Sequence, residues 1–236
     1  MNTLPSFIIL VFILTSFISV YLFYIASGRK KTLLLVIIGW MILHAMLARS
    51  GFYLETGTIP PRMTLALLPP LLAIIFLFNS KNGRLFIDKF NIKTVTLIHL
   101  IRIPVEMVLF WLFLHKLMPQ LMTFEGRNAD MISGITAPVV YYFAFVKRKM
   151  GNRLLMVWNI VCLAILTFTV VNAILSLPCP LQKFAFDQPV VAVLYFPFIW
   201  LPAVVVPVVY FSHLVTIRQL WLMEKERTGS VKLVTA

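Results

Sequence analysis

Seven long runs of apolar residues dominate this sequence of 236 residues and limit what it can fold into. A helix that crosses a bilayer needs about 20 mostly apolar residues, with a range of roughly 17–25. The runs that reach or approach this length are Pro5–Ala26, Leu33–Arg49, Arg62–Phe78, Thr94–Leu114, Met131–Val146, Leu154–Leu177 and Pro189–Ile217. Only 12% of the residues are charged, against about 25% in soluble domains. We therefore expect an all-α polytopic membrane protein, a seven-transmembrane-helix bundle.

The loops between these runs differ in positive charge, and the difference alternates along the chain. One set of loops, with the C-terminal end, carries Arg29, Lys30, Lys31, Lys81, Arg84, Lys89, Lys93, Lys147, Arg148, Lys149, Arg153, Arg218, Lys225, Arg227 and Lys232. The other set carries Arg49, Arg62, Lys116, Arg127 and Lys183. Cytoplasmic loops are the ones enriched in lysine and arginine. The pattern therefore predicts an N-terminus outside and a C-terminus in the cytoplasm, in the plasma membrane.

This placement of charge also bears on domains and partners. The net charge is +13, which in a soluble protein would suggest a nucleic-acid partner. Here nearly all the charges lie at the ends of apolar runs, so we expect the bilayer as partner and no nucleic acid. Residues 1–236 are expected to form a single transmembrane domain that ends in a short cytoplasmic tail, residues 218–236.

Prolines and a weak internal similarity suggest how the helices are organised. The third run has Pro69-Pro70 at its centre, and the last holds Pro197, Pro202 and Pro207. Each proline removes a backbone donor, so we expect both helices to be bent. Similar tyrosine, basic and tryptophan positions in the first and second halves suggest a 3+1+3 arrangement, as parallel repeats give in some transporters. Chance is the alternative, because these residue types gather at membrane interfaces in any case.

The fourth run carries ionisable residues near the middle of the membrane. His99, Arg102 and Glu106 share one helical face, and Arg102 and Glu106 are four residues apart and can pair. A charge at this depth costs at least about 2.5–3.5 kcal/mol, so the face must look into the bundle or a wet cavity. Two interpretations remain: a site for a substrate, ion or proton, or a structural ion pair that locks this helix to its neighbours.

The loop after this run is the most polar of the outer loops. Arg127, Asn128 and Asp130 lie within four residues just before the next apolar run. They could line the mouth of a pocket that opens to the outside. Alternatively, the segment is a polar turn in which Asp130 caps the next helix, as aspartate often does. A plain turn would not explain Arg127 and Asn128.

The histidines are scattered over several runs. His44 lies in the outer half of the second run, with Arg49 about one turn beyond it. His99 and His213 lie at similar depth and could meet. Two histidines can ligate haem or a metal, but no further ligand pattern accompanies them. We expect no metal and no cofactor.

The motifs of several enzyme classes are absent from the sequence. It has no HExxH, GxSxG or P-loop motif, and no lysine in Pro189–Ile217 to hold a retinal Schiff base. A membrane-embedded enzyme acting on a lipid-like substrate remains an alternative, as does a sensor or partner subunit without chemistry. The enzyme would use the polar residues of the outer half, namely His44, Arg49, His115, Arg127, Asn128 and Asp130.

The expected function is the binding or transport of a small solute at a polar site within the bundle, so we lean away from an enzyme. In this hypothesis Arg102 attracts an anionic group and Glu106 takes or gives a proton. Arg127 and Asp130 gate the outer side of the site. His99, His44, Arg49 and Asn128 complete the candidate ligand-binding residues.

Overall fold

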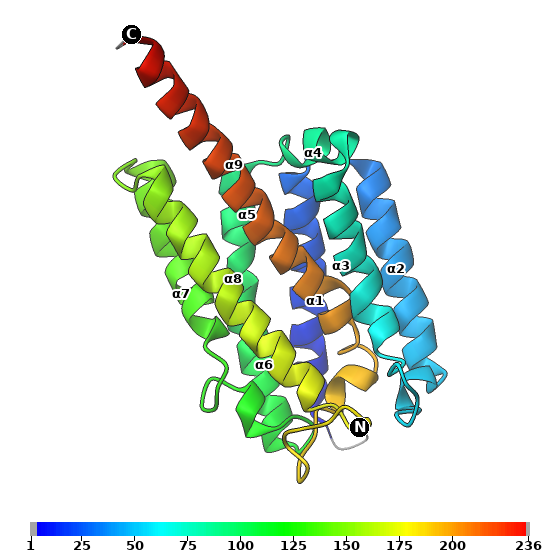
Figure 1. The fold of residues 1–236 in the computed structure, drawn as a ribbon. Helices are drawn as coiled ribbons and strands as arrows, with labels where there is room; N and C mark the ends of the chain where they lie inside the picture. Colours follow the sequence, from blue (N-terminus) through cyan, green and yellow to red (C-terminus); the bar gives the residue numbers. More distant parts are fainter. Residues whose placement is uncertain (1–3, 235–236) are drawn as a thin grey trace.

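The computed structural model describes residues 4–234, and from residue 228 onward it describes the backbone alone. Every regular element in this range is helical, which confirms the prediction of an all-α chain. The α-helices are α1 Ser6–Ala26, α2 Lys31–Arg49, α3 Thr64–Asn79, α4 Lys81–Ile87, α5 Ile92–Ile98, α6 Arg102–Leu114, α7 Asp130–Tyr141, α8 Asn152–Leu175 and α9 Val206–Val234. They form one bundle, with the two termini at opposite ends (Figure 1).

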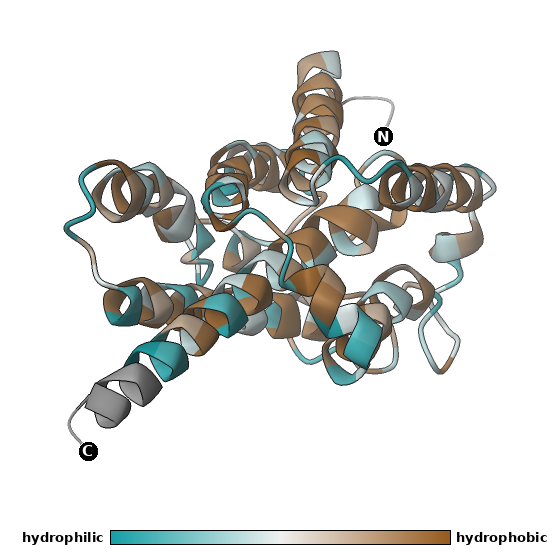
Figure 2. Cartoon of the chain, turned by 90° about the horizontal axis from the view of Figure 1, so that it is seen from above, coloured by the Kyte–Doolittle hydropathy of each residue, from teal (hydrophilic) through white to brown (hydrophobic). Residues whose placement is uncertain are grey.

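Five helical segments are long and apolar enough to cross a membrane, which fits the expectation of a membrane-embedded bundle. They are Ser6–Ala26, Lys31–Arg49, Ile92–Leu114, Asn152–Leu175 and Leu201–Arg227. A sixth crossing is reached if α3 and the bent α4 are taken together, and Asp130–Val146 is a shorter apolar helix. Seen along the bundle, the helices are mostly apolar and the polar residues gather in the loops and the outer part of α9 (Figure 2).

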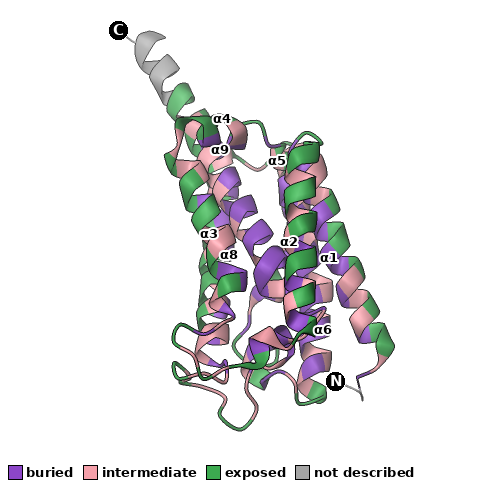
Figure 3. Cartoon of the chain, turned by 90° about the vertical axis from the view of Figure 1, so that its right-hand side faces the viewer, coloured by how far each residue is buried: buried purple, intermediate pink, exposed green. Residues whose placement is uncertain are grey.

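The helices are buried to very different extents. In the most apolar part of Leu201–Arg227, which includes most of α9, 67% of the residues are buried. In the corresponding part of α2 only 17% are buried. Exposed residues run along α2 (Figure 3). The last helix is therefore central to the bundle, and α2 lies at its edge.

The third helix is bent, but not where its prolines predicted. Pro69 and Pro70 lie inside α3, which continues through them to Asn79. The bend of 99° comes at the break before α4, which lies across the end of the bundle (Figure 1). Ser80 caps the start of α4, because its hydroxyl accepts a hydrogen bond from the Gly83 N–H at 3.0 Å.

The last helix differs from its predicted range at both ends. The segment from 189 to 200 contains one 3-10 turn and loops, and regular structure begins with a π-helical segment, Leu201–Val205. Pro202 suits that first turn, where a missing N–H costs nothing. Pro207 lies further in and leaves the Ala203 carbonyl without its usual helical donor. The Trp40 indole replaces that donor, with an Nε1–O distance of 3.1 Å.

The helical segment that carries the central ionisable residues consists of two α-helices joined by a short 3-10 turn. α5 begins earlier than the predicted Thr94, because the Asn91 side chain caps it by accepting from the N–H groups of Lys93 and Thr94. A 3-10 turn, His99–Ile101, separates α5 from α6. Pro104 lies just beyond this turn and cannot donate to the carbonyl four residues before it. The turn places Arg102 at the start of α6.

Candidate functional site

A small, partly open cavity lies where α3, α6, α8 and the last helix meet. Its volume is about 80 Å³, and its lining is apolar apart from the four polar side chains Arg102, Glu106, Asp130 and Thr169. Such a volume is well below the roughly 300–1,000 Å³ of sites for drug-sized ligands. The cavity can therefore hold a few waters or the polar group of a small solute.

Arg102 forms its ion pair with Asp130, not with Glu106 as its helical spacing predicted. The Arg102 Nη1 donates to Asp130 Oδ1 at 2.9 Å, and both residues are at least 95% buried. Gly134 permits this pairing, because a Cβ there would lie 2.9 Å from Ile103 Cγ1 and 3.2 Å from Arg102 Cβ. The close approach of α7 to the start of α6 brings the aspartate within reach of the guanidinium.

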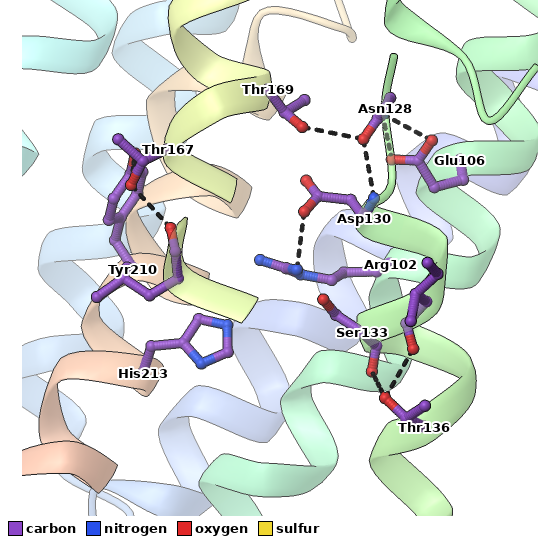
Figure 4. A network of polar contacts seen from close by, with 12 residues as sticks. Arg102, Glu106, Asn128, Asp130, Ser133, Thr136, Thr167, Thr169, Tyr210 and His213 are labelled. Atoms are coloured by element: carbon purple, nitrogen blue, oxygen red, sulfur yellow. Dashed lines mark hydrogen bonds and ion pairs between the residues drawn. The ribbon is translucent and has the colours of Figure 1, made fainter. Parts of the chain in front are cut away.

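Asn128 is the centre of the remaining polar contacts (Figure 4). Its Nδ2 donates to the two Glu106 carboxylate oxygens at 2.7 and 2.8 Å and to the Met122 carbonyl at 3.1 Å. Its Oδ1 accepts from the Asp130 N–H and from the Thr169 hydroxyl, both at 3.0 Å. One amide thus joins α6, the outer loop, α7 and α8.

The predicted role of Asp130 as a helix cap is wrong. Asp130 is the first residue of α7, and no side chain caps that helix in the usual way. Its side chain points to Arg102, while its N–H is satisfied by Asn128. The tertiary ion pair takes precedence because a buried guanidinium without a counter-charge would cost several kcal/mol.

Arg102 keeps donors that no group in the described part of the chain satisfies. A guanidinium has five N–H donors, but Nε and Nη2 of Arg102 lack a partner although both atoms are buried. The Ser133 hydroxyl, which lies beside Arg102 in Figure 4, is also unpartnered. Buried donors left unpaired cost about 1–3 kcal/mol each, and more when charged. These donors on Arg102 therefore need a hydrogen-bond acceptor, which a water or a bound solute can supply.

His99 and His213 meet, as their similar depth predicted. Their rings are stacked, with centroids 3.9 Å apart and planes at 17°, and both side chains are fully buried. Nδ1 of His213 is hydrogen-bonded to Asn159 Oδ1 at 2.9 Å, whereas both ring nitrogens of His99 lack a partner among the described residues. No group of three or more metal-ligating side chains occurs in the described part of the chain.

The other candidate residues lie apart from this network. His44 is hydrogen-bonded to the Tyr53 hydroxyl and stands edge-on to Trp40. Burial raises the pKa of Tyr53 to about 12, so its hydroxyl keeps its proton at neutral pH. Arg49 lies over the Phe196 ring at 4.7 Å and Arg127 over the Phe184 ring at 5.8 Å, both measured from the guanidinium carbon to the ring centroid.

These positions do not assemble the outer-half cluster that the enzyme alternative requires. His44 is held by Tyr53, Arg49 and His115 are exposed, and only Asn128 and Asp130 belong to the network. Arg127 is exposed on the outer loop, and its guanidinium lies over an aromatic ring rather than in the network. The structure thus brings together Arg102, Glu106, Asn128 and Asp130, with His99 nearby.

Sequence reasoning missed two polar residues of α8. Thr169 hydrogen-bonds to Asn128, and Asn159 hydrogen-bonds to His213. Both are buried. A polar residue within a run as apolar as Leu154–Leu177 was the available signal, since membrane helices use such side chains to contact one another.

Comparisons of the chain with protein-family models, with curated proteins and with solved structures gave no match.

Proposed function

We propose that the protein binds a small solute bearing a carboxylate or similar acceptor group in the cavity beside Arg102 and moves it across the membrane. The observation that carries the proposal is the pair of buried, unpartnered donor atoms on Arg102, Nε and Nη2, at a cavity that Arg102 lines. Guanidinium groups bind carboxylates through two parallel N–H···O bonds. The apolar remainder of the lining suits the hydrocarbon part of such a solute.

The charges around the cavity link this binding to a proton. Arg102 and Asp130 neutralise each other, so an arriving anion adds a negative charge close to Glu106. Two negative charges at short range in a medium of low dielectric repel strongly. Binding of the anion is therefore expected to be accompanied by a proton on Glu106, and a lower external pH favours both.

The same proposal includes seven crossings with the N-terminus outside and the C-terminus in the cytoplasm of a plasma membrane. The support is that the basic loops alternate with loops poor in basic residues, and that α7 with its π-helical end, Asp130–Val146, is apolar. A strong tilt or locally thinner bilayer accommodates a short span.

The two native cysteines can test this orientation. Cys179 is half-buried in the loop after α8, and Cys162 is buried within α8. A membrane-impermeant maleimide added to intact cells should label Cys179 and spare Cys162. A second variant, Cys179→Ala/Arg148→Cys, should be labelled only after the cells are opened. Labelling in the reverse order would overturn the orientation.

Solute uptake can be tested with the purified protein in phosphatidylcholine liposomes. We expect radiolabelled lactate to accumulate faster than in protein-free liposomes when the outside is more acidic than the inside. Arg102→Gln should abolish uptake, and Glu106→Gln, which preserves side-chain shape, should remove its pH dependence. Arg153→Gln is the matched control, because Arg153 is exposed and does not line the cavity.

The outcomes separate the alternatives. If lactate stabilises the protein against heating but accumulates no faster than in protein-free liposomes, the site serves a sensor rather than a transporter. If Arg102→Gln and Glu106→Gln fold and behave like the wild type in both uptake and heat stabilisation, the proposed site is wrong.

A further inference from the structure

A second and larger cavity shares no lining residue with the cavity of the polar network. This groove has a volume of about 310 Å³ and lies between α1, α2, α3 and the last helix, with α4 at one end. Residues that line it include Val36, Trp40, Pro70, Ala73, Phe86 and Pro207. None of the side chains that line it is charged. It is an apolar groove at the level of the bilayer.

At the groove, a tryptophan side chain pairs with a backbone carbonyl that would otherwise face hydrocarbon without a donor. Non-helical or unpaired carbonyls cannot face lipid, because nothing there can donate to them. Pro207 frees the Ala203 carbonyl, and both residues line the groove. The Trp40 indole N–H donates to that carbonyl at 3.1 Å and so removes the polar defect from the wall.

Positive charge gathers at the α4 end of the groove. Lys30 Nζ lies 5.6 Å from the centroid of the Phe86 ring, which lines the groove. Lys31 begins α2 two residues before the groove residue Leu33, and Arg84 precedes Phe86 by two residues on α4. All three basic side chains are exposed and none is in an ion pair among the described residues.

The start of α2 adds to this positive charge, and the nearby acidic residue does not offset it. α2 starts at Lys31 with no acidic residue in its first turn and no side-chain cap, so the positive end of its dipole adds to the lysines. Asp88 is the acidic residue that follows α4, and it is paired with Arg218 at 2.8 and 2.9 Å. It therefore does not neutralise the basic cluster formed by Lys30, Lys31 and Arg84.

We infer that this groove binds an anionic phospholipid, with one acyl chain against α2 and α3 and the phosphate at Lys30, Lys31 and Arg84. The groove runs from Leu33 to Trp40 along α2, which is about 10 Å at 1.5 Å per residue. One leaflet has about 15 Å of hydrocarbon, so the groove has the depth of part of one acyl chain. Charge complementarity and the apolar lining together favour a lipid over a soluble ligand.

Lipid retention by the purified full-length protein tests the inference. The protein is incubated with equal amounts of phosphatidylglycerol and phosphatidylcholine that carry the same acyl chains, and the lipids retained are counted by native mass spectrometry. Each basic residue near an anionic lipid surface is worth roughly a fivefold gain in binding. We expect a clear preference for phosphatidylglycerol in the wild type.

Two sets of variants separate the headgroup from the chain. Lys30→Gln/Lys31→Gln/Arg84→Gln should lower phosphatidylglycerol retention at least about tenfold, whereas the control Lys147→Gln/Arg148→Gln/Lys149→Gln should not. Val36→Trp places a ring in the groove and should reduce retention of both lipids. Val161→Trp is its control, because Val161 is an exposed valine on α8 outside the groove. Ala73→Trp repeats the test if Val36→Trp does not fold.

Three results would overturn the inference: equal retention of the two lipids by the wild type, equal losses in the two triple variants, or unchanged retention when the groove is filled. A stable dimer that Val36→Trp disrupts would assign the groove to a second copy of the chain instead. Each variant is first checked for native helix content and a single size-exclusion peak, so that loss of lipid is not loss of fold.

Discussion

The polar cavity and the apolar groove place charge in opposite ways. At the cavity, Arg102, Glu106 and Asp130 are buried, and each is held by a partner on another segment. At the groove, Lys30 and Arg84 stay exposed at the membrane end, and the interior is left to apolar side chains. The comparison shows two solutions to one problem, since a charge in this bundle is either paired inside or kept at the water boundary.

Removing one partner of the buried ion pair is the strongest way to break this comparison. Asp130→Ala leaves Arg102 charged and uncompensated, which should cost about 3–5 kcal/mol of the free energy of unfolding. Arg102→Met/Asp130→Leu removes both charges and should recover most of that loss. Unfolding of the protein in detergent micelles, followed by circular dichroism, measures both.

The pair of Arg153 and Glu224, in which the arginine is exposed, gives the contrast for this measurement. The Arg153 side chain is 83% exposed, so Arg153→Gln should change the stability by no more than about 1 kcal/mol. If Asp130→Ala proves as mild as Arg153→Gln, the cavity is well hydrated and the Arg102–Asp130 pair is not a buried one.

The close approach of α7 to α6 at Gly134 gives a second test of the buried site, with an expected loss of stability of intermediate size. Gly134→Ala puts a methyl group 2.9 Å from Ile103 Cγ1, and such overpacking should cost about 1–3 kcal/mol. Gly39→Ala in α2 is the matched control, because a Cβ there meets nothing within 4 Å and alanine favours a helix. Thermal unfolding of both variants under the same conditions decides this, and equal melting temperatures would contradict the proposed helix contact.

The smallest expected effect concerns the wall of the groove. Trp40→Phe keeps the apolar contact but removes the hydrogen bond to the Ala203 carbonyl. Hydrogen bonds between membrane helices average about 0.6 kcal/mol, so the melting temperature should fall only slightly. Lipid retention should fall clearly even though the melting temperature changes little, because the freed Ala203 carbonyl belongs to the groove. A fall in stability without a change in lipid retention would show that the bond only holds α2 in place.

The fold was largely predictable because its main determinants are local. Runs of about 20 apolar residues identify the long helices whatever they pack against, and the described part of the chain has five of the seven predicted, or six if α3 and α4 are taken together. The end of the last helix was not predictable in this way, because α9 continues to Val234 through a polar stretch. The bend before α4 depends on the capping by Ser80 rather than on the prolines of α3. The 3+1+3 repeat stays a prediction.

Most members of the polar network were predictable from the sequence, but their pairing was not. Helical spacing and the cost of membrane charges indicated Arg102 and Glu106 as inward-facing residues, and both are buried. The choice of Asp130 over Glu106 depends on how closely α7 approaches at Gly134, which is a tertiary property. Thr169 and Asn159 were missed because hydropathy averages hide single polar residues within an apolar run.

The slight burial of α2 has a consequence for how the bundle comes apart. Two indole hydrogen bonds fasten this helix, one from Trp40 to the Ala203 carbonyl and one from Trp200 to the Met41 carbonyl. A segment with few buried contacts opens at a lower free energy than the core around it. In hydrogen exchange, the backbone N–H groups of α2 should therefore exchange before those of α9. We expect separation of α2 from the bundle to be the first step of unfolding within the membrane.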